Sequence, residues 1–557
     1  MPLETPARIV RELARHGYNA EREAVTLIAG AADPGTTLAR AVEHAGPDSF
    51  RVTAEDVRAV LDAGPNATDA PVSDPASPAE TPPTDPGTTD PTTDGGAAAG
   101  RPADNDAHES ASTPASTPST DPSTSSGETN DEDSIGPKSA APETEGNRSG
   151  RSLDTSLRSL DVANDMTGQS TGTGEYGDFV KVFKDRYEKL SRQLRGRVNH
   201  RPAEAIQSMS GGSDAAMVGL VNDIRSTASG HWLVELEDTT GTFPCLVMKD
   251  REFASAVEEL LLDECIAVEG TLADDAGIMF VDSMYSPDVP RTYRPNTADR
   301  HVQAALISDV HVGSQEFMTD AWQRFTSWLH TEEAEHVEYL LIAGDMVEGV
   351  GVYPNQDEEL DIVDIYDQYE QFSEHLKEVP GDMEIVMIPG NHDAVRLAEP
   401  QPGFDEHLRD IMSVHDAHIT SNPSTVTLEG VKVLMYHGVS LDEVIAELPA
   451  ESASYDEPHK AMYQLLKKRH VAPQYGGHTR LAPEEKDYLV MEEVPDVFHT
   501  GHVHKLGWGK YHNVLAVNSG CWQAQTDFQK SVNIDPDAGY APILDLDTLE
   551  MTVRKFS

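Results

Sequence analysis

From residue 302 onward, short apolar segments alternate with helical stretches, and five of the apolar segments end in a polar cluster. The clusters are Asp309 and His311 in AALISDVHVGS, Asp345 in LLIAGDMVEG, Asn391, His392 and Asp393 in IVMIPGNHD, His437 in VLMYHG, and His502 and His504 in DVFHTGHVHKLG. The length of each apolar segment is typical of a buried strand. Because functional side chains of layered α/β sheets gather at strand ends, the pattern predicts one site built by all five clusters.

The residue types in these clusters favour a site for two metal ions. Carboxylate oxygens and imidazole nitrogens suit Mn²⁺, Zn²⁺ or Fe, whereas ligands that are all oxygen suit Mg²⁺ or Ca²⁺. Alternate residues of an extended chain point the same way, so the D-x-H and H-x-H segments can each offer two ligands. Asp345 follows a glycine and can bridge two metals, which at about 3.5–4 Å apart can hold both the attacking and the leaving oxygen of a phosphoryl displacement.

The order D-x-H, GD-x-x-x-G, GNHD, H-G, GH-x-H resembles the calcineurin-like metallophosphoesterases. That resemblance implies two ligand sets, one of Asp309, His311, Asp345 and His504 and the other of Asp345, Asn391, His437 and His502. It implies that His392 is not a ligand but acts on the leaving oxygen of the scissile phosphate, and that Glu348 orients His392. A solvated turn residue is the alternative for Glu348. We expect two divalent metal ions, with Mn²⁺ favoured and Zn²⁺, Fe or Mg²⁺ as alternatives.

The segments between the clusters are similar to the small subunits of the archaeal family-D DNA polymerases, over about residues 176–557. They include GDMVEGVGVYPNQDEEL, MIPGNHDAVRLAEPQP and LLKKRHVAPQYGGHTRLAPEEKDYLV. The resemblance implies a 3′→5′ proofreading exonuclease that acts on a DNA 3′ end, and a large partner subunit that adds nucleotides.

Two alternatives stay open at the level of sequence. In the B-subunits of eukaryotic replicative polymerases, which are also similar, the phosphoesterase domain is generally degraded and serves as a scaffold; in this chain no ligand position is replaced. A phosphatase for small molecules or proteins would share the metal site but not the segments between the clusters.

The sequence predicts a multidomain chain. We expect a small helical module at 1–63, a disordered acidic linker at 64–174, a connecting helix at 175–212 and an OB-type β-barrel at 213–292. Residues 300–557 are expected to form the α/β phosphoesterase domain, a calcineurin-like β-sandwich with flanking helices. The helical module either docks a partner or only adds stability. For the barrel, which carries few aromatic residues, we favour an interface role over single-strand binding.

The formal net charge is −54, and no lysine precedes Lys138. Acidic residues are expected on the solvent faces of folded segments such as 357–367 and 484–487, which is typical of a protein in a high-salt cytoplasm. Because the Debye length is about 3 Å in molar salt, this charge does not exclude DNA as a partner. The densest basic run, Lys467, Lys468 and Arg469, either contacts phosphate or reflects the preference for cations at a helix C-terminus.

The three cysteines, Cys245, Cys265 and Cys521, are isolated and are expected to be buried small hydrophobic residues. No apolar run approaches the 18 residues of a membrane span, and the N-terminus lacks the pattern of a signal peptide. We therefore expect an intracellular protein, associated with the nucleoid, without a membrane partner.

Overall fold

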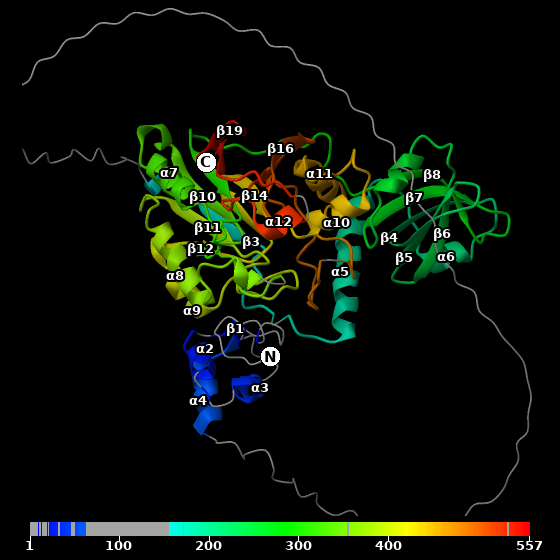
Figure 1. Ribbon diagram of the computed structural model, residues 1–557. Helices are drawn as coiled ribbons and strands as arrows, with labels where there is room; N and C mark the ends of the chain where they lie inside the picture. Colours follow the sequence, from blue (N-terminus) through cyan, green and yellow to red (C-terminus); the bar gives the residue numbers. More distant parts are fainter. Residues whose placement is uncertain are drawn as a thin grey trace, which may run out of the picture. The chain divides into compact units, whose positions relative to one another are not determined.

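The computed structural model describes residues 9, 13, 19–20, 22–29, 31, 34–45, 51–62, 155–170, 172–353, 356–477, 479–531 and 534–557 (Figure 1). Most of the predicted acidic linker, 64–154, lies outside these residues. In the N-terminal part, helices α2 (Arg22–Ala29), α3 (Pro34–Ala45) and α4 (Ala54–Asp62) accompany a parallel pair of short strands, β1 (Asn19–Ala20) and β2 (Arg51–Val52). This part therefore contains helices, as expected, together with a small sheet.

Two six-stranded sheets form the largest part of the chain. The strand order of the first is β12 (His418–Ile419), β11 (Glu384–Ile388), β10 (Val337–Ala343), β9 (Gln303–Ile307), β18 (Tyr540–Asp545) and β19 (Glu550–Lys555). The order of the second is β16 (Leu506–Tyr511), β17 (Val514–Ser519), β15 (Val497–Thr500), β14 (Val431–Met435), β13 (Ser424–Leu428) and β3 (Leu160–Ala163). Strands β9 to β12 are parallel to one another, and so are β14, β15 and β17.

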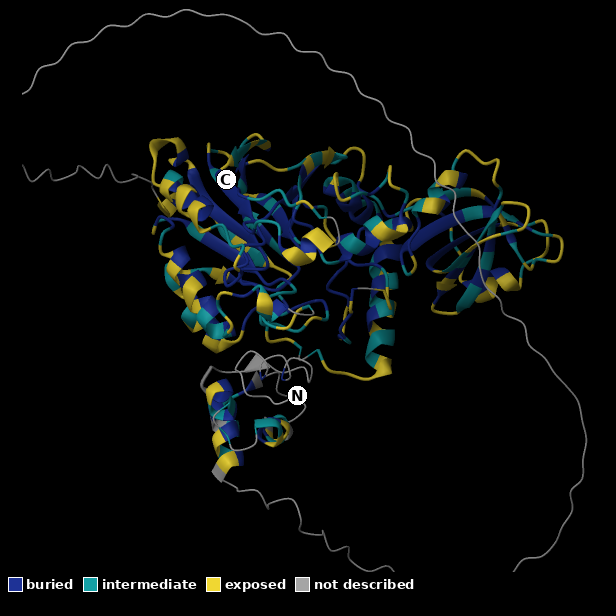
Figure 2. Cartoon of the chain, viewed as in Figure 1, coloured by how far each residue is buried: buried dark blue, intermediate teal, exposed yellow. Residues whose placement is uncertain are grey.

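The sheets share a hydrophobic core, and helices cover their outer faces (Figure 2). Because successive side chains of a strand point to opposite faces, the fully buried β10 contributes to two cores. Leu341 belongs to the core between the sheets, whereas Leu340 and Ile342 pack with helices α7 (Thr319–Leu329), α8 (Ile365–Leu376) and α9 (Glu406–Ile411). Helices α10 (Ser440–Glu447) and α11 (Pro458–Lys468) cover the second sheet. The predicted sandwich of sheets with flanking helices is thus present.

A closed five-stranded barrel precedes the two sheets in the sequence, within the predicted range 213–292. Its strands follow the order β4 (Asp214–Ser226), β5 (Trp232–Asp238), β6 (Gly241–Val247), β8 (Met279–Tyr285) and β7 (Cys265–Leu272). Helix α5 (Tyr176–Leu194) lies where the connecting helix is predicted, and α6 (Ala203–Gln207) adds Ala203 and Ile206 to the barrel core. All three cysteines are free and buried, as expected. Among the described residues, no helix combines the length and hydropathy that a membrane crossing requires.

The end of the predicted linker differs from the structure. Residues 155–170 are not a linker, because β3 pairs antiparallel with β13 at the edge of the second sheet. Arg158 fixes this segment by an ion pair with Glu338 and a hydrogen bond to the carbonyl oxygen of Asp382. Four strand residues after a long polar run give too weak a period to be recognised in the sequence.

The interpretation of 484–487 as a solvated acidic face is also wrong for two of its residues. Glu484 and Asp487 are buried, and each pairs with an arginine distant in sequence: Arg396 at 2.6 Å and Arg186 at 2.7 Å. Burial of a carboxylate requires such a partner. The partners lie 88 and 301 positions away, so no local pattern announces them.

The basic run at the end of α11 contacts the barrel segment. The Lys468 ammonium lies 2.9 Å from the Glu264 carboxylate, and both side chains are buried, at 2% and 1% exposure. Lys467 pairs with Glu259 at 2.7 Å, and these side chains are 26% and 27% exposed. Arg469 ends α11 in the left-handed conformation and donates to the carbonyl oxygens of Met491 and Glu492. The run therefore serves internal contacts.

We expect Lys468→Met to lower the free energy of unfolding by about 3–5 kcal/mol, because it leaves the Glu264 carboxylate buried without a counter-charge. Lys467→Met is the matched control, with an expected loss of about 0–1 kcal/mol, since its ion pair is partly solvated. Urea unfolding followed by tryptophan fluorescence measures both. Equal losses in the two variants would contradict the importance of the buried pair, and Glu264→Gln in the Lys468→Met background should recover most of the loss.

Candidate metal centre

The five polar clusters lie in the turns that follow β9, β10, β11, β14 and β15. Because the first three strands are parallel neighbours, as are the last two, their carboxyl ends meet at one edge of each sheet. Ligand atoms of Asp309, His311 and His504 lie within 4.8 Å of one another, and those of Asp309, Asp345 and His437 do likewise. The predicted convergence of the clusters is therefore present.

The backbone at this site is strained. Five of the seven predicted ligands have a positive φ: Asp309 at 53°, His311 at 56°, Asp345 at 53°, His502 at 72° and His504 at 54°. A non-glycine residue held in this region costs on the order of 1–3 kcal/mol, and such residues concentrate at functional sites. Glycine is required nearby, because a Cβ at Gly390 would lie 2.2 Å from Asp345 Oδ1 and one at Gly501 would lie 2.3 Å from Asp309 Oδ2.

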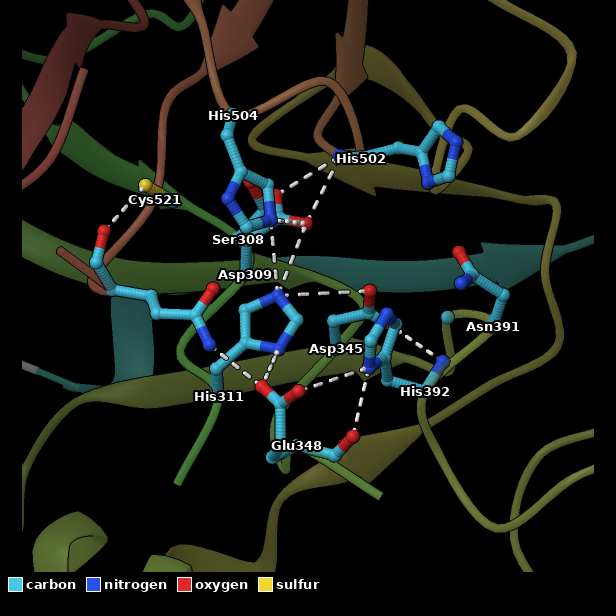
Figure 3. Close-up of polar contacts among 12 residues, drawn as sticks. Ser308, Asp309, His311, Asp345, Glu348, Asn391, His392, His502, His504 and Cys521 are labelled. Carbon is cyan, nitrogen blue, oxygen red and sulfur yellow. Dashed lines mark hydrogen bonds and ion pairs between the residues drawn. The ribbon is translucent and has the colours of Figure 1, made fainter. Parts of the chain in front are cut away.

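The first ligand group centres on His311, which is buried (Figure 3). Its Nδ1 lies 2.9 Å from Glu348 Oε2, so Nε2 is the nitrogen left for a ligand. That Nε2 lies 3.0 Å from His504 Nε2, 3.8 Å from Asp345 Oδ2 and 3.9 Å from Asp309 Oδ1. Metal bonds of about 2.0–2.2 Å place neighbouring ligand atoms roughly 3–3.5 Å apart, so the group is close to the spacing of a coordination sphere.

The second group tests directly whether a cation fits. His437 Nδ1 donates to the carbonyl oxygen of Ala343 at 2.8 Å, which leaves Nε2 facing Asp345 Oδ2 at 3.1 Å and Asn391 Oδ1 at 3.0 Å. In neutral His437 these would be three acceptors facing one another. Burial disfavours a charged imidazole, yet the Asp345 carboxylate outweighs burial and raises the pKa of His437 to about 10. The pocket therefore demands positive charge at this point, and a divalent cation fits that demand.

His502 is the predicted ligand whose ring lies apart from these groups. Its backbone N–H donates to both carboxylate oxygens of Asp309, at 3.1 and 3.0 Å. Its ring is turned away from His311 and His504 (Figure 3), and Nε2 lies 3.0 Å from Asp442 Oδ2. The ring centroid is 5.2 Å from that of His437, so His502 borders the second group without joining it.

His392 is half-buried and is held by two hydrogen bonds. Its backbone N–H donates to Asp345 Oδ1 at 2.8 Å, and its Nδ1 lies 2.7 Å from the carbonyl oxygen of Glu348. Its Nε2 is thereby left as the nitrogen available to a reacting group. His392 lines a cavity of about 140 Å³, together with His311, Asp345, Glu348, His502 and His504.

Glu348 differs in part from its predicted role. Its carboxylate is buried, which rules out a solvated turn residue, and it is closer to His311 than to His392, at 2.9 against 3.9 Å. Burial alone would raise the pKa of Glu348, but His311 outweighs burial and lowers the pKa to about 2. The carboxylate thus orients a candidate ligand, while the backbone carbonyl of the same residue orients His392.

Two residues without an assigned role in the sequence support the site. Asp393 Oδ2 accepts from the backbone N–H groups of Asp345 and Gly390, each at 2.8 Å, and so ties two of the turns together. Its position within GNHD is a usable signal. Gln523 donates to Glu348 Oε2 at 2.7 Å from 175 residues away, and nothing in its local sequence marks it.

Comparisons with known proteins bear on the same region. A profile of the family described as the B-type subunit of DNA polymerase alpha/epsilon matches residues 304–506. The DNA polymerase II small subunit of Halobacterium salinarum is 63% identical over 558 residues, with 100% of both chains covered. That of Archaeoglobus fulgidus is 43% identical over 414 residues, 73% of this chain and 82% of the relative. That of Methanothermobacter thermautotrophicus is 39% identical over 403 residues, 70% of this chain and 82% of the relative.

We expect Mn²⁺ at 100 times its dissociation constant to add about 2.7 kcal/mol per site to the free energy of unfolding, because the ion binds only the folded chain. Asp345→Asn should remove most of this increment, since Asp345 faces both ligand groups. The control is Asp320→Asn on α7, an exposed aspartate, which should keep the full increment. Thermal unfolding with and without Mn²⁺ gives the comparison.

We expect Glu348→Gln to weaken Mn²⁺ binding by about 10- to 100-fold, because the carboxylate fixes the orientation and basicity of His311. Isothermal titration calorimetry measures the change. Unaltered Mn²⁺ affinity would show that the carboxylate acts on His392 instead.

Proposed function

Since the chain belongs to the family of DNA polymerase II small subunits, we propose that it supplies the 3′→5′ exonuclease of a two-subunit replicative DNA polymerase. In this proposal it hydrolyses the terminal phosphodiester at a DNA 3′ end with two divalent metal ions, Mn²⁺ being favoured. The observation that carries the proposal is the strained, anionic convergence of the predicted ligands around Asp345. A chain that served only as a scaffold would gain nothing from holding five such residues in an unfavourable conformation.

The bound metals would supply the positive charge that lowers the pKa of water and neutralises the phosphate in the displacement. Asp309, His311, Asp345 and His504 would hold one ion, and Asp345, Asn391, His437 and His502 the other. His502 requires a change of ring orientation for that role, from Asp442 toward His437. Glu348 keeps Nε2 of His311 directed into the centre through the contact at Nδ1.

His392 is the candidate general acid. With Nδ1 fixed on the carbonyl oxygen of Glu348, its Nε2 can present a proton to the departing 3′ oxygen. The backbone N–H bond to Asp345 ties this histidine to the ligand cluster, so the proton donor and the metal ligands keep a fixed spacing. The products would be a 5′-mononucleotide and a strand shorter by one residue.

We also propose that the chain binds a large polymerase subunit and works inside the cell on DNA. The names of the relatives, which call each of them a small subunit, support the first part. The match to the polymerase alpha/epsilon profile keeps a second function in view, a scaffold that needs no catalysis. The two functions are compatible, and we favour their combination.

The test of catalysis is an exonuclease assay of the full chain, with and without the large subunit, on a 5′-labelled oligonucleotide in molar KCl. We expect Mn²⁺-dependent shortening from the 3′ end, abolished by EDTA. His392→Ala should lower the rate by about 10²–10⁴-fold, the usual contribution of a general acid. The same variant should retain Mn²⁺ stabilisation, because His392 is not a ligand in this proposal.

Two outcomes would redirect the proposal. A polymerase complex that proofreads equally well with Asp345→Asn would leave only the scaffold. Faster turnover of a simple phosphomonoester than of a single-stranded oligonucleotide would indicate a phosphatase instead.

A further inference from the structure

Aromatic side chains stand at the rim of the cavity that holds the candidate metal centre. The cavity lining includes Tyr353, Tyr455 and Phe528 besides the polar residues described above. Phe528, on helix α12 (Asp527–Ser531), is 43% exposed, and Tyr455 is 39% exposed. Large aromatic residues so exposed are uncommon without a partner, and their position beside reacting groups points to a ligand.

The ring of Phe528 is stacked on that of Tyr353, with centroids 4.9 Å apart and an angle of 25° between the planes. Tyr353 is fixed in turn, because its hydroxyl donates to Glu348 Oε1 at 3.1 Å. The carboxylate of Glu348 holds His311, so one bonded chain runs from the candidate metal ligand to the ring that supports Phe528. The orientation of this aromatic pair is therefore set by the metal centre.

Tyr455 is connected to the site in a similar way. Its hydroxyl donates to Asp442 Oδ1 at 3.0 Å, and the other oxygen of Asp442 lies 3.0 Å from His502 Nε2. Each tyrosine at the rim is thus one carboxylate away from a predicted ligand histidine.

The size of the cavity separates a phosphate from a base. Its volume is about 140 Å³. A protein cavity of roughly 150 Å³ accommodates a single benzene ring, so this one cannot enclose the phosphate, sugar and base of a nucleotide together. If the phosphate occupies the centre, the attached base must lie at the rim, where the aromatic rings are.

The charges around the cavity leave few other means of holding DNA. Among the described residues that line it, none is lysine or arginine. The net charge of −54 also disfavours attraction of the phosphate backbone. Stacking of bases on aromatic rings is independent of net charge and tolerates any base.

On the basis of the exonuclease function proposed above, we propose that Phe528, backed by Tyr353, is the stacking platform for the 3′-terminal base, with Tyr455 bounding the other side of the rim. A base that lies on this platform has left its own helix, and unpairing costs least when the terminal pair is mismatched. The platform therefore favours unpaired 3′ ends, which is the substrate class that proofreading requires.

The test compares two single-stranded oligonucleotides, one ending in a normal 3′ nucleotide and one whose terminal residue lacks its base. For the full chain with Mn²⁺, we expect the ratio of kcat/KM between them to fall by about 5- to 150-fold in Phe528→Ala, the range that loss of one stacked base represents. Phe528→Trp should restore the ratio. Phe280→Ala is the matched control, an equally exposed phenylalanine on β8 of the barrel, and should leave the ratio unchanged.

A loss of rate on both oligonucleotides alike in Phe528→Ala would overturn the platform, because it would indicate a structural role. A second measurement keeps this result separate from failure of the exonuclease proposal. Fluorescence anisotropy gives the affinities of both oligonucleotides when the terminal linkage is a phosphorothioate that resists hydrolysis. If the wild-type chain hydrolyses neither substrate, a preference for the base-bearing end that disappears in Phe528→Ala supports the platform, and equal affinities in the wild-type chain overturn it.

Discussion

The arrangement of the site depends on two carboxylates, Asp309 and Asp345, that are buried together at the ends of neighbouring parallel strands. Each is shielded from water, so their negative charge must be balanced by groups of the protein or by bound cations. Backbone N–H groups supply part of the balance, from His502 to Asp309 and from His392 to Asp345. His437 supplies more, and the remaining deficit explains why the pocket is suited to divalent ions. The left-handed turns, the glycines and the histidines are all consequences of bringing these two carboxylates together.

The sequence predicts the centre well because each functional cluster is local. Asp309 with His311, and His392 with Asp393, follow apolar strands within a few residues, and parallel strands bring such ends to one edge. Prediction was weaker wherever a role depends on residues distant in sequence. The carboxylate of Glu348 turns toward His311 rather than His392 because Gln523 and Gln356 hold it there. Similarly, Glu484 and Asp487 look like surface residues until their arginine partners are known. The ring of His502 is a third example, since Asp442 competes for it.

The barrel and the sandwich are joined by contacts of the kind found inside domains. The buried pair of Lys468 and Glu264 lies at this junction, and so does the core that α5 shares with β4 and β7. A basic run that could have contacted DNA is consumed there. Recognition of DNA by this chain must therefore use something other than a dense cationic surface near α11, which agrees with the aromatic rim of the candidate site.

Strand β3 has a consequence for how the N-terminal region is attached. It occupies the open edge of the second sheet beside β13, and an uncovered edge strand is a template for pairing with another molecule. The segment that leads out of the long acidic stretch thus shields the domain from edge-to-edge association. Severing the chain upstream of residue 155 would separate the N-terminal helices yet leave that guard in place. The acidic stretch can accordingly vary in length and composition among related proteins without exposing the sheet.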